Sequence, residues 1–368
     1  MTFSESDKNF MLRALELARA AKGRTFPNPA VGAVVVTAEG KAAGEGATGV
    51  YGGPHAEKNA LKKAGAAARG GTLYVTLEPC SHFGRTPPCT DEIIKAGIKK
   101  VVTAVKDPNP LVGGKGMRQL KSHGIIVESG LLKNEAVIIN EDFFWSITQK
   151  RPWITLKLAM TLDGRVADDQ NASRWITSAQ SRRFVQELRR CHSAIAVGKN
   201  TLLHDNPRLT ARCGKTYFPA RIVFSSDTDI PQDSYFFTNS HETRSIVVLR
   251  DSGNVKRISS KDNLEFWYTA SLNYSESINA FLDMAYAESI TSIFIEGGQR
   301  LASSFLEHGF VNKVHLFYGN KIFGKGKESL LFSRGLPVSN CLNLEKINHR
   351  SLGEDFLVSG YVKQLMYK

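Results

Sequence analysis

Several features are scarce or missing in this 368-residue sequence, and each gap excludes a class of protein. No apolar run approaches the roughly 20 residues that a membrane-spanning helix needs. The opening segment, MTFSESDKNFMLRALELARA, carries mixed charges and predicts an amphipathic helix rather than a signal peptide. The 5 cysteines are an odd number, and without an export signal a disulfide framework is not expected. We therefore expect a cytoplasmic protein that makes no contact with a membrane.

The sequence also lacks a basic arm, an internal repeat and a G-x-G-x-x-G segment, so a standard dinucleotide-binding fold has no support. The net charge is nevertheless +13, from lysines and arginines that are scattered over the whole chain. A solvated surface with a basic bias explains this charge without any partner. Among anionic partners, phosphorylated small molecules fit the scattered pattern better than nucleic acid does.

The length favours two domains, because each half of the chain is long enough to bury its own core. Helix and strand patterns alternate in both halves, which is typical of layered α/β domains. The pattern breaks where an aromatic helix end runs into Lys150-Arg151-Pro152, and a new strand follows. We therefore place a boundary near residue 148, which gives domains 1–147 and 148–368. The predicted strands are 30–36, 72–77, 100–105, 125–128, 153–159, 193–198, 220–225, 245–249, 291–296 and 312–318, and the predicted helices are 10–21, 54–68, 90–96, 116–123, 178–190, 276–288 and 299–308.

The most specific pattern in the chain joins His55-Ala56-Glu57 to Cys80 and Cys89. One imidazole and two thiolates are the three protein ligands of a catalytic zinc ion, which keeps its fourth position for water. Pro54 predicts a helix start at His55, and a further helix start near Cys80 is expected to favour its thiolate. Glu57 is poorly placed as a ligand, and we expect it to take a proton from the zinc-bound water and pass it to the ring nitrogen and the leaving ammonia. The pattern His-x-Glu…Pro-Cys…Cys is typical of zinc deaminases.

A structural zinc site with His82 as its fourth ligand is the alternative interpretation. Eight residues separate the two cysteines, whereas nucleoside and tRNA deaminases typically have two there. The longer loop, SHFGRTPP, would bring His82 and Arg85 to the mouth of the site, where they could meet an anionic substituent. Asn28 lies before Pro29 in extended backbone, so its amide is free to read the edge of a heterocycle, unless the segment is a plain turn.

The motifs of the second half are weaker. The segment 293–301, IFIEGGQRL, predicts a buried strand, a glycine pair and a helix start that would suit a phosphate, although a simple turn explains it equally well. Lys157 lies in an apolar strand, where a lysine snorkels or pairs unless it meets a ligand. These residues by themselves indicate an α/β domain that binds phosphates.

Taken together, segments from nearly the whole chain resemble the bifunctional deaminase–reductase family of riboflavin biosynthesis. They are PNPAVG (27–32), PHAE (54–57), TLEPCSHFGRTPPC (76–89), DPNP (107–110), LKLAMTLDGR (156–165), SRWITS (173–178), TLLHDNPRLTAR (201–212) and IEGGQRLA (295–302). The resemblance implies an N-terminal, cytidine-deaminase-like domain with three α/β/α layers and a C-terminal, dihydrofolate-reductase-like α/β domain. Residues 226–290 and the C-terminal tail match the family only weakly.

The resemblance also implies two consecutive reactions. The first is the zinc-dependent hydrolytic deamination of 2,5-diamino-6-(5-phosphoribosylamino)pyrimidin-4(3H)-one. The second is the NADPH-dependent reduction of the ribosyl group, which gives 5-amino-6-(5-phosphoribitylamino)uracil. We accordingly expect phosphorylated pyrimidine substrates, no nucleic acid, one zinc ion per chain, and a homo-oligomer that is a dimer or a tetramer.

Site roles in the second half are carried over by position. The residues implied to bind the reductase substrate are Lys157, near the reacting sugar, Ser173, Arg189, Leu209, Arg212 and Glu296. The residues implied to bind the cofactor are Ala159, Trp175, Thr201, Asp205, Ser226, Gly298, Gln299, Arg300, Leu301, Ala302, Ser303 and Ser304. The chain departs from the family at Ala159-Met160-Thr161, where Gly or Ala-Ser is frequent, and at Ser225-Ser226, where Asp-Ser is common. The preference for NADPH over NADH comes from the family alone.

Two other functions are compatible with the zinc motif. One is a deaminase of another nucleobase, a nucleoside or tRNA with an unrelated C-terminal domain, although the cysteine spacing disfavours it. A tRNA enzyme would also need a basic groove and would bind RNA with a marked salt dependence. The other function is a non-catalytic zinc-binding module that uses the basic surface to bind nucleic acid.

Overall fold

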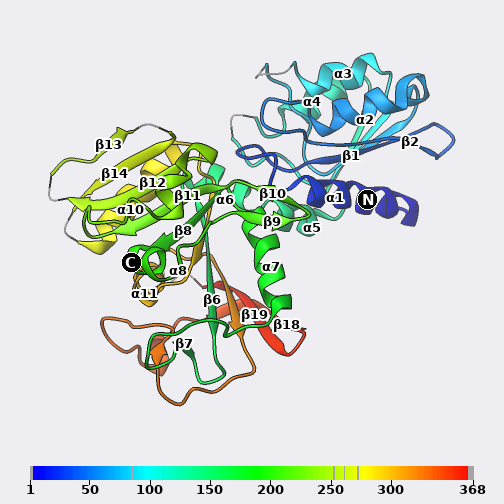
Figure 1. The fold of residues 1–368 in the computed structure, drawn as a ribbon. Coiled ribbons are helices and arrows are strands. Elements are labelled where there is room, and N and C mark those ends of the chain that lie inside the picture. The colour runs from blue at the N-terminus through cyan, green and yellow to red at the C-terminus, as the bar shows by residue number, and fades with distance from the viewer. Residues whose placement is uncertain are drawn as a thin grey trace. The chain divides into compact units, whose positions relative to one another are not determined.

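The computed structural model describes residues 3–83, 87–110, 112–251, 253–260, 262–271 and 273–363. The chain forms two compact units, Met1–Lys150 and Arg151–Lys368. Figure 1 shows the elements of each. Within the described ranges, no helix has the length and apolar character that crossing a membrane requires.

The N-terminal unit is built on a five-stranded sheet with the strand order β2-β1-β3-β4-β5. Strand β1 runs antiparallel to both β2 and β3, whereas β3, β4 and β5 are parallel. Helix α1 packs on one face of this sheet, and α2 covers the other (Figure 1). The elements are α1 Glu5–Ala21, β1 Gly32–Val36, β2 Ala42–Ala47, α2 Ala56–Ala64, β3 Thr72–Val75, α3 Cys89–Lys95, β4 Lys100–Thr103, α4 Lys115–Ser122, β5 Ile126–Ser129, α5 Lys133–Ile139 and α6 Glu141–Gln149.

Small residues in β1 and β2 allow α1 and α2 to pack closely against the sheet. A Cβ atom on Gly32 would lie 1.9 Å from the Ala14 carbonyl oxygen of α1, and one on Gly46 would lie 2.2 Å from the Ala56 carbonyl oxygen of α2. All of β1, with the sequence GAVVV, is buried. The buried central strand and the two helical layers confirm the predicted α/β/α arrangement.

The C-terminal unit contains a ten-stranded sheet with the order β13-β14-β12-β11-β8-β15-β6-β16-β19-β18. The strands from β14 to β16 in this order are parallel, and β13, β19 and β18 are antiparallel to their neighbours. The elements are β6 Trp153–Met160, β7 Arg165–Ala167, α7 Ala179–Arg190, β8 Ala194–Gly198, α8 Lys199–Asp205, β9 Ala211–Cys213, β10 Lys215–Tyr217, β11 Ala220–Ser225, α9 Tyr235–Thr238, β12 Ser245–Asp251, β13 Lys256–Ser259, β14 Leu264–Ala270, α10 Tyr274–Ala287, β15 Ser292–Glu296, α11 Gln299–Glu307, β16 Lys313–Tyr318, β17 Lys327–Glu328, β18 Leu344–Leu352 and β19 Asp355–Val362.

Every predicted strand and helix has a counterpart in the structure, but one local prediction is wrong. A helix start was expected near Cys80, whereas α3 begins at Cys89. The segment between them includes Pro87 and Pro88, which have no backbone N–H to donate and fix their own φ angles, so the helix starts only after them. The sequence patterns also missed several elements, notably β2, β13 and β14.

Candidate active sites

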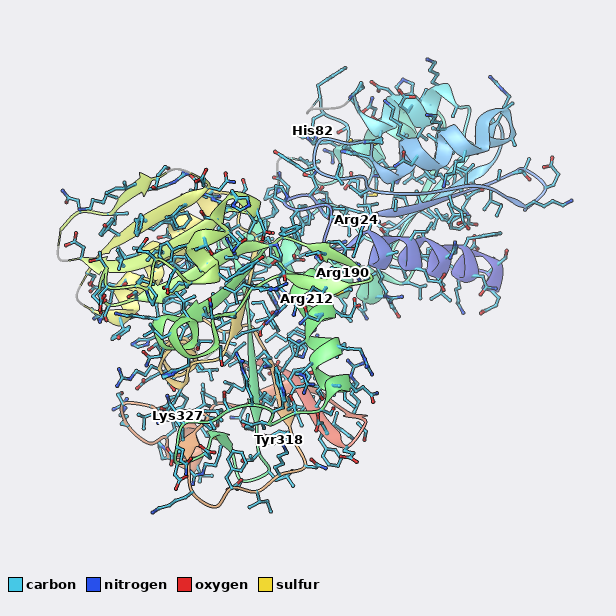
Figure 2. The ribbon with its side chains drawn as sticks, viewed as in Figure 1. Arg24, His82, Arg190, Arg212, Tyr318 and Lys327 are labelled. Carbon is cyan, nitrogen blue, oxygen red and sulfur yellow. The ribbon has the colours of Figure 1, made fainter. Side chains whose placement is uncertain are left out.

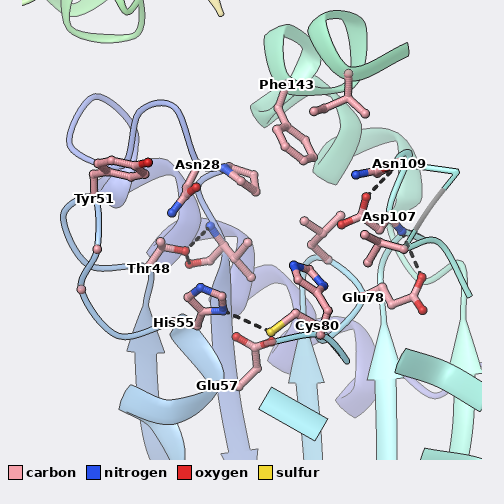
Figure 3. A pocket seen from close by; sticks show the side chains of 18 residues that line it. Asn28, Thr48, Tyr51, His55, Glu57, Glu78, Cys80, Asp107, Asn109 and Phe143 are labelled. Carbon is pink, nitrogen blue, oxygen red and sulfur yellow. Dashed lines mark hydrogen bonds between the residues drawn. The ribbon is translucent and has the colours of Figure 1, made fainter. Parts of the chain in front are cut away.

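The first site is a cavity of about 370 Å³ in the N-terminal unit (Figure 3). Its lining comes from five segments: the one before β1, those that follow β2, β3 and β4, and helix α6. Because β1 is antiparallel to β2 and β3, the four segments next to the strands meet at one edge of the sheet. The predicted residues that line the cavity are Asn28, His55, Glu57, Cys80 and His82.

The geometry of three side chains fits a zinc ion. The Nδ1 atom of His55 lies 3.5 Å from the Cys80 sulfur and 3.2 Å from the Cys89 sulfur. The ligand atoms of His55, Cys80 and Cys89 all lie within 4.8 Å of one another, and they are the one such group of metal-binding side chains among the described residues. Tetrahedral zinc, with bonds of about 2.0 Å to nitrogen and 2.3 Å to sulfur, holds such atoms roughly 3.5 Å apart. One nitrogen and two sulfurs therefore stand close to the positions that zinc requires.

Without a metal, the thiols of Cys80 and Cys89 differ in pKa, because the two sulfurs interact with each other and with His55. The Cys89 thiol donates to Cys80, and with His55 and the Cys89 N–H at 3.3 Å it lowers the pKa of Cys80. The same hydrogen bond raises the pKa of Cys89. In the absence of a metal these shifts favour the thiolate at Cys80 over Cys89, and a bound zinc ion would favour the thiolate at both cysteines.

Glu57 lies beside these ligands at the beginning of α2. Its side chain is only 4% exposed. Burial, and next the charge of Cys80, raise the pKa of Glu57 to about 7. A carboxyl group with a pKa near neutrality can accept a proton and return it in one reaction cycle.

Other residues of this cavity were not assigned a role from the sequence. They include Thr48, Tyr51, Glu78, Asp107, Asn109 and Phe143, and Figure 3 shows these side chains around the same cavity. Burial raises the pKa of Asp107, whose carboxylate accepts the Asn109 N–H at 2.8 Å. The DPNP segment was a visible signal for Asp107 and Asn109, but Phe143 comes from α6 and carried none. His82 projects from the loop after β3 (Figure 2), and Arg85 lies outside the described residues.

The second site is a cavity of about 750 Å³ in the C-terminal unit. Arg212 and Lys327, both labelled in Figure 2, contribute to its lining. The predicted residues that it brings together are Lys157, Ala159, Ser173, Trp175, Arg189, Thr201, Asp205, Arg212, Glu296, Gly298 and Gln299. Those that do not line it are Leu209, Ser226, Arg300, Leu301, Ala302, Ser303 and Ser304.

An ion pair lies at the base of this second cavity. The Arg189 guanidinium donates two hydrogen bonds to Glu296, from Nε to Oε1 and from Nη2 to Oε2, the latter 2.9 Å long. Burial acts to raise the pKa of Glu296, but the charge and hydrogen bonds of Arg189 outweigh it, so the pKa is lowered. Lys157 pairs with Glu296 in the register of β6 and β15, and burial lowers the pKa of Lys157. The Glu296 carboxylate is therefore hydrogen-bonded to Arg189, and its charge also acts on the Lys157 ammonium.

The wall of the second cavity combines an exposed aromatic ring with a glycine pair. Trp175 is 59% exposed, and the Arg182 guanidinium lies 4.2 Å from the centre of its ring. Gly297 and Gly298 have φ angles of 71° and 82°, which side chains rarely tolerate, and α11 begins directly after them. The predicted strand, glycine pair and helix start are therefore present.

The contacts of several remaining predicted residues are made elsewhere than in the lining of this cavity. Leu209 and Ala302 are buried in the core. The Ser303 hydroxyl donates to the Gln299 carbonyl at 2.7 Å, and that of Ser304 donates to the Arg300 carbonyl at 2.9 Å. Ser226, after the end of β11, donates to the Asp227 carboxylate at 3.0 Å.

Comparison with known families and structures agrees with both halves of the chain. Residues 4–105 match the cytidine and deoxycytidylate deaminase zinc-binding region, and residues 152–358 match the RibD C-terminal domain. The riboflavin biosynthesis protein RibD of Aquifex aeolicus is 42% identical over 356 residues, which cover 96% of this chain and 98% of that protein. The RibD protein of Escherichia coli is 37% identical over 352 residues, or 90% of this chain and 92% of that protein.

Solved structures show the same similarity. The diaminohydroxyphosphoribosylaminopyrimidine deaminase/5-amino-6-(5-phosphoribosylamino)uracil reductase of Thermotoga maritima aligns with a TM-score of 0.84 and 38% identity, covering 97% of this chain and 99% of that one. RibD of Acinetobacter baumannii aligns with a TM-score of 0.86 and 30% identity, covering 97% of this chain and 99% of that one. These matches confirm the predicted cytidine-deaminase-like and dihydrofolate-reductase-like folds and the predicted cofactors, zinc and NADPH. The chain belongs to the RibD family, the bifunctional deaminase/reductase enzymes of riboflavin biosynthesis.

Proposed function

We propose that the N-terminal unit deaminates 2,5-diamino-6-(5-phosphoribosylamino)pyrimidin-4(3H)-one. The observation that carries this proposal is the close group of His55, Cys80 and Cys89 with the buried Glu57 beside it. Zinc, when bound there, supplies a Lewis acid that lowers the pKa of a coordinated water. Glu57 would carry one proton of the attacking water to the ring nitrogen and the second, from the resulting hydroxyl group, to the amino group, which would then leave as ammonia.

The walls of the first cavity supply recognition of the pyrimidine. Asn28 and Asn109 each offer an amide that can both donate to and accept from a heterocycle edge. Phe143 provides an apolar surface for the ring. His82 and Arg85 belong to the loop that we assign to the phosphorylated ribosyl end of the substrate.

We propose that the C-terminal unit reduces the deaminated product with NADPH. NADPH, when bound, would supply the hydride for the sugar carbon bound to the amine, and a proton would go to the ring oxygen as its bond to that carbon opens. We assign Lys157 to guiding the sugar. We assign the hydrogen-bonded pair of Arg189 and Glu296 to the surface on which the sugar lies. The remaining substrate contacts that we assign are Ser173, Leu209 and Arg212.

The proposed cofactor site is centred on the glycine pair and the start of α11. The N–H groups at the start of α11 suit a pyrophosphate, and the exposed Trp175 ring offers a surface to an aromatic group of the cofactor. We assign cofactor contacts to Ala159, Trp175, Thr201, Asp205, Ser226 and Gly298 through Ser304.

A two-step assay tests both halves. The full chain should release ammonia from the diaminopyrimidine without NADPH, and should oxidise NADPH when given the deaminated product. Glu57→Gln should keep one zinc ion and NADPH oxidation but release no ammonia. Full ammonia release by this variant would exclude Glu57 as the proton carrier. Release of ammonia from cytidine or tRNA, with none from the diaminopyrimidine, would favour the rival deaminase.

Assembly and location are part of the same proposal. We propose a cytoplasmic homo-oligomer, a dimer or tetramer, with domains 1–147 and 148–368 and no affinity for nucleic acid. Light scattering on the purified chain measures the mass, and a monomer would contradict the assembly. Limited proteolysis should cut near residue 148.

A further inference from the structure

A buried carboxylate next to the metal ligands has no part in the proposed chemistry. Glu78 is 4% exposed and lies two residues before Cys80. Its Oε2 atom accepts the N–H groups of Asp107 at 3.2 Å and Gly114 at 2.8 Å. Its Oε1 atom accepts the N–H of Met117 at 3.2 Å. One side chain thus holds three backbone donors that come from a different part of the chain.

These donors belong to the wall of the substrate cavity and to the helix behind it. Figure 3 shows the Glu78 carboxylate next to the segment that carries Asp107 and Asn109. The Glu78 N–H also donates to the Val105 carbonyl at 2.9 Å, so backbone and side chain both tie this residue to the same segment. Gly114 and Met117 lie at the start of α4.

Helix α4 packs closely against the segments that carry the two cysteine ligands. A Cβ atom on Gly116 would lie 2.0 Å from the Pro79 carbonyl oxygen, so α4 presses on the peptide that precedes Cys80. Thr90, which follows the ligand Cys89, donates from its hydroxyl to Gln119 of α4 at 2.9 Å. Helix α4 therefore supports the neighbours of both cysteine ligands.

We propose that Glu78 is a positioning residue of the deaminase site, which fixes the Cys80 ligand relative to the Asp107–Asn109 wall. This inference rests on the proposed deaminase function. Loss of the carboxylate would loosen both the ligand segment and the pocket wall. Zinc affinity and substrate affinity should therefore fall together, although Glu78 touches neither metal nor reacting atoms. Groups that orient metal ligands from behind typically contribute 10-fold to 100-fold to metal affinity or activity.

The test compares Glu78→Gln with Asp7→Asn in the full chain. Glutamine keeps the shape but replaces one acceptor oxygen with a donor that opposes a backbone N–H. Asp7 is the matched control, because it accepts the Tyr74 hydroxyl at 2.6 Å and caps α1 without lining the cavity. Zinc affinity is measured by competition with a chelator, KM and kcat by ammonia release at saturating zinc, and Tm by thermal unfolding.

We expect Glu78→Gln to weaken zinc binding about 10-fold to 100-fold and to raise KM more than it lowers kcat. We expect Asp7→Asn to lower Tm while leaving zinc affinity and KM unchanged. The proposal is overturned if Glu78→Gln binds zinc within twofold of the parent chain, or if Asp7→Asn weakens zinc equally. If the parent chain releases no ammonia from the diaminopyrimidine, the proposed function fails, and zinc affinity alone decides the role of Glu78.

Discussion

The ion pair between Arg189 and Glu296 makes a quantitative prediction about the C-terminal unit. Their side chains are only 12% and 10% exposed. In Glu296→Gln, the guanidinium and the nearby Lys157 ammonium would remain in the same buried place without a carboxylate. Breaking a buried pair in this way costs about 3–5 kcal/mol. At roughly 2–4 °C per kcal/mol for a unit of this size, Tm should fall by roughly 6–20 °C.

The stability of the same variant should change with pH in a definite direction. Burial already lowers the pKa of Lys157 from 10.5, and the charge of Glu296 opposes that shift. Glu296→Gln removes the opposing charge, so the pKa of Lys157 in the folded variant falls further. Between that lowered pKa and 10.5, the unfolded chain binds more protons than the folded chain, and stability rises with pH. The loss of unfolding free energy in the variant, relative to the parent chain, should therefore become smaller as the pH is raised from 7 towards 10.

Urea unfolding followed by tryptophan fluorescence measures both effects, because Trp153, Trp175 and Trp267 lie in the C-terminal unit. The matched control is Glu187→Gln, whose carboxylate pairs with Arg190 at 3.2 Å and is 48% exposed. Exposed pairs contribute about 0–1 kcal/mol. A loss for Glu296→Gln no larger than that of the control would refute the reasoning, as would a deficit that grows with rising pH.

Three further outcomes are expected. Burial, followed by the charges of Lys313, His192 and Arg350, lowers the pKa of His315 from 6.5 to about 3, so its neutral form is favoured in the folded state. Between pH 3 and 6.5 the unfolded chain binds the extra proton and stability rises with pH, and urea titrations of His315→Gln should show this slope reduced by up to about 1.4 kcal/mol per pH unit. Gly32→Ala should destabilise the N-terminal unit by about 1–3 kcal/mol or more in thermal unfolding, because its Cβ would overlap the carbonyl of α1 that lies 1.9 Å away. Removing zinc with a chelator should abolish ammonia release but leave NADPH oxidation with the deaminated product intact; loss of both would contradict two independent sites.

The zinc group could be predicted from sequence because its chemistry is local. Pro54 and the apolar spacing after it predict a helix start, and the structure places His55 at the N-cap of α2. The partner cysteines follow the predicted strand 72–77, which the structure contains as β3. The walls of the cavity were harder to predict, since Asp107 and Phe143 reach it only through the order of the strands and the path of α6.

One edge of the second sheet could not be predicted for a different physical reason. Strand β13 is exposed along its whole length, and its residues KRIS show no alternation of apolar and polar side chains. Hydrophobic periodicity reflects burial. An edge strand that is held mainly by backbone hydrogen bonds therefore has little periodic pattern in its sequence. The buried strands β6, β8 and β15 were predicted because each is an apolar run.

Strand register explains why scattered motifs make a single reductase site. Lys157 and Glu296 lie 139 positions apart in the sequence, yet β6 and β15 pair in parallel with these two residues opposite each other. Thr201 and Asp205 follow the carboxyl end of β8, which is the other neighbour of β15. Carboxyl ends of parallel strands meet at one edge of a sheet, where binding sites of open α/β sheets occur. A shift of β6 by one residue would bring Leu156 or Leu158 to the position of Lys157 and turn the ammonium towards the opposite face. The register, which no local pattern encodes, therefore decides whether the Arg189–Glu296 pair faces a lysine or a leucine.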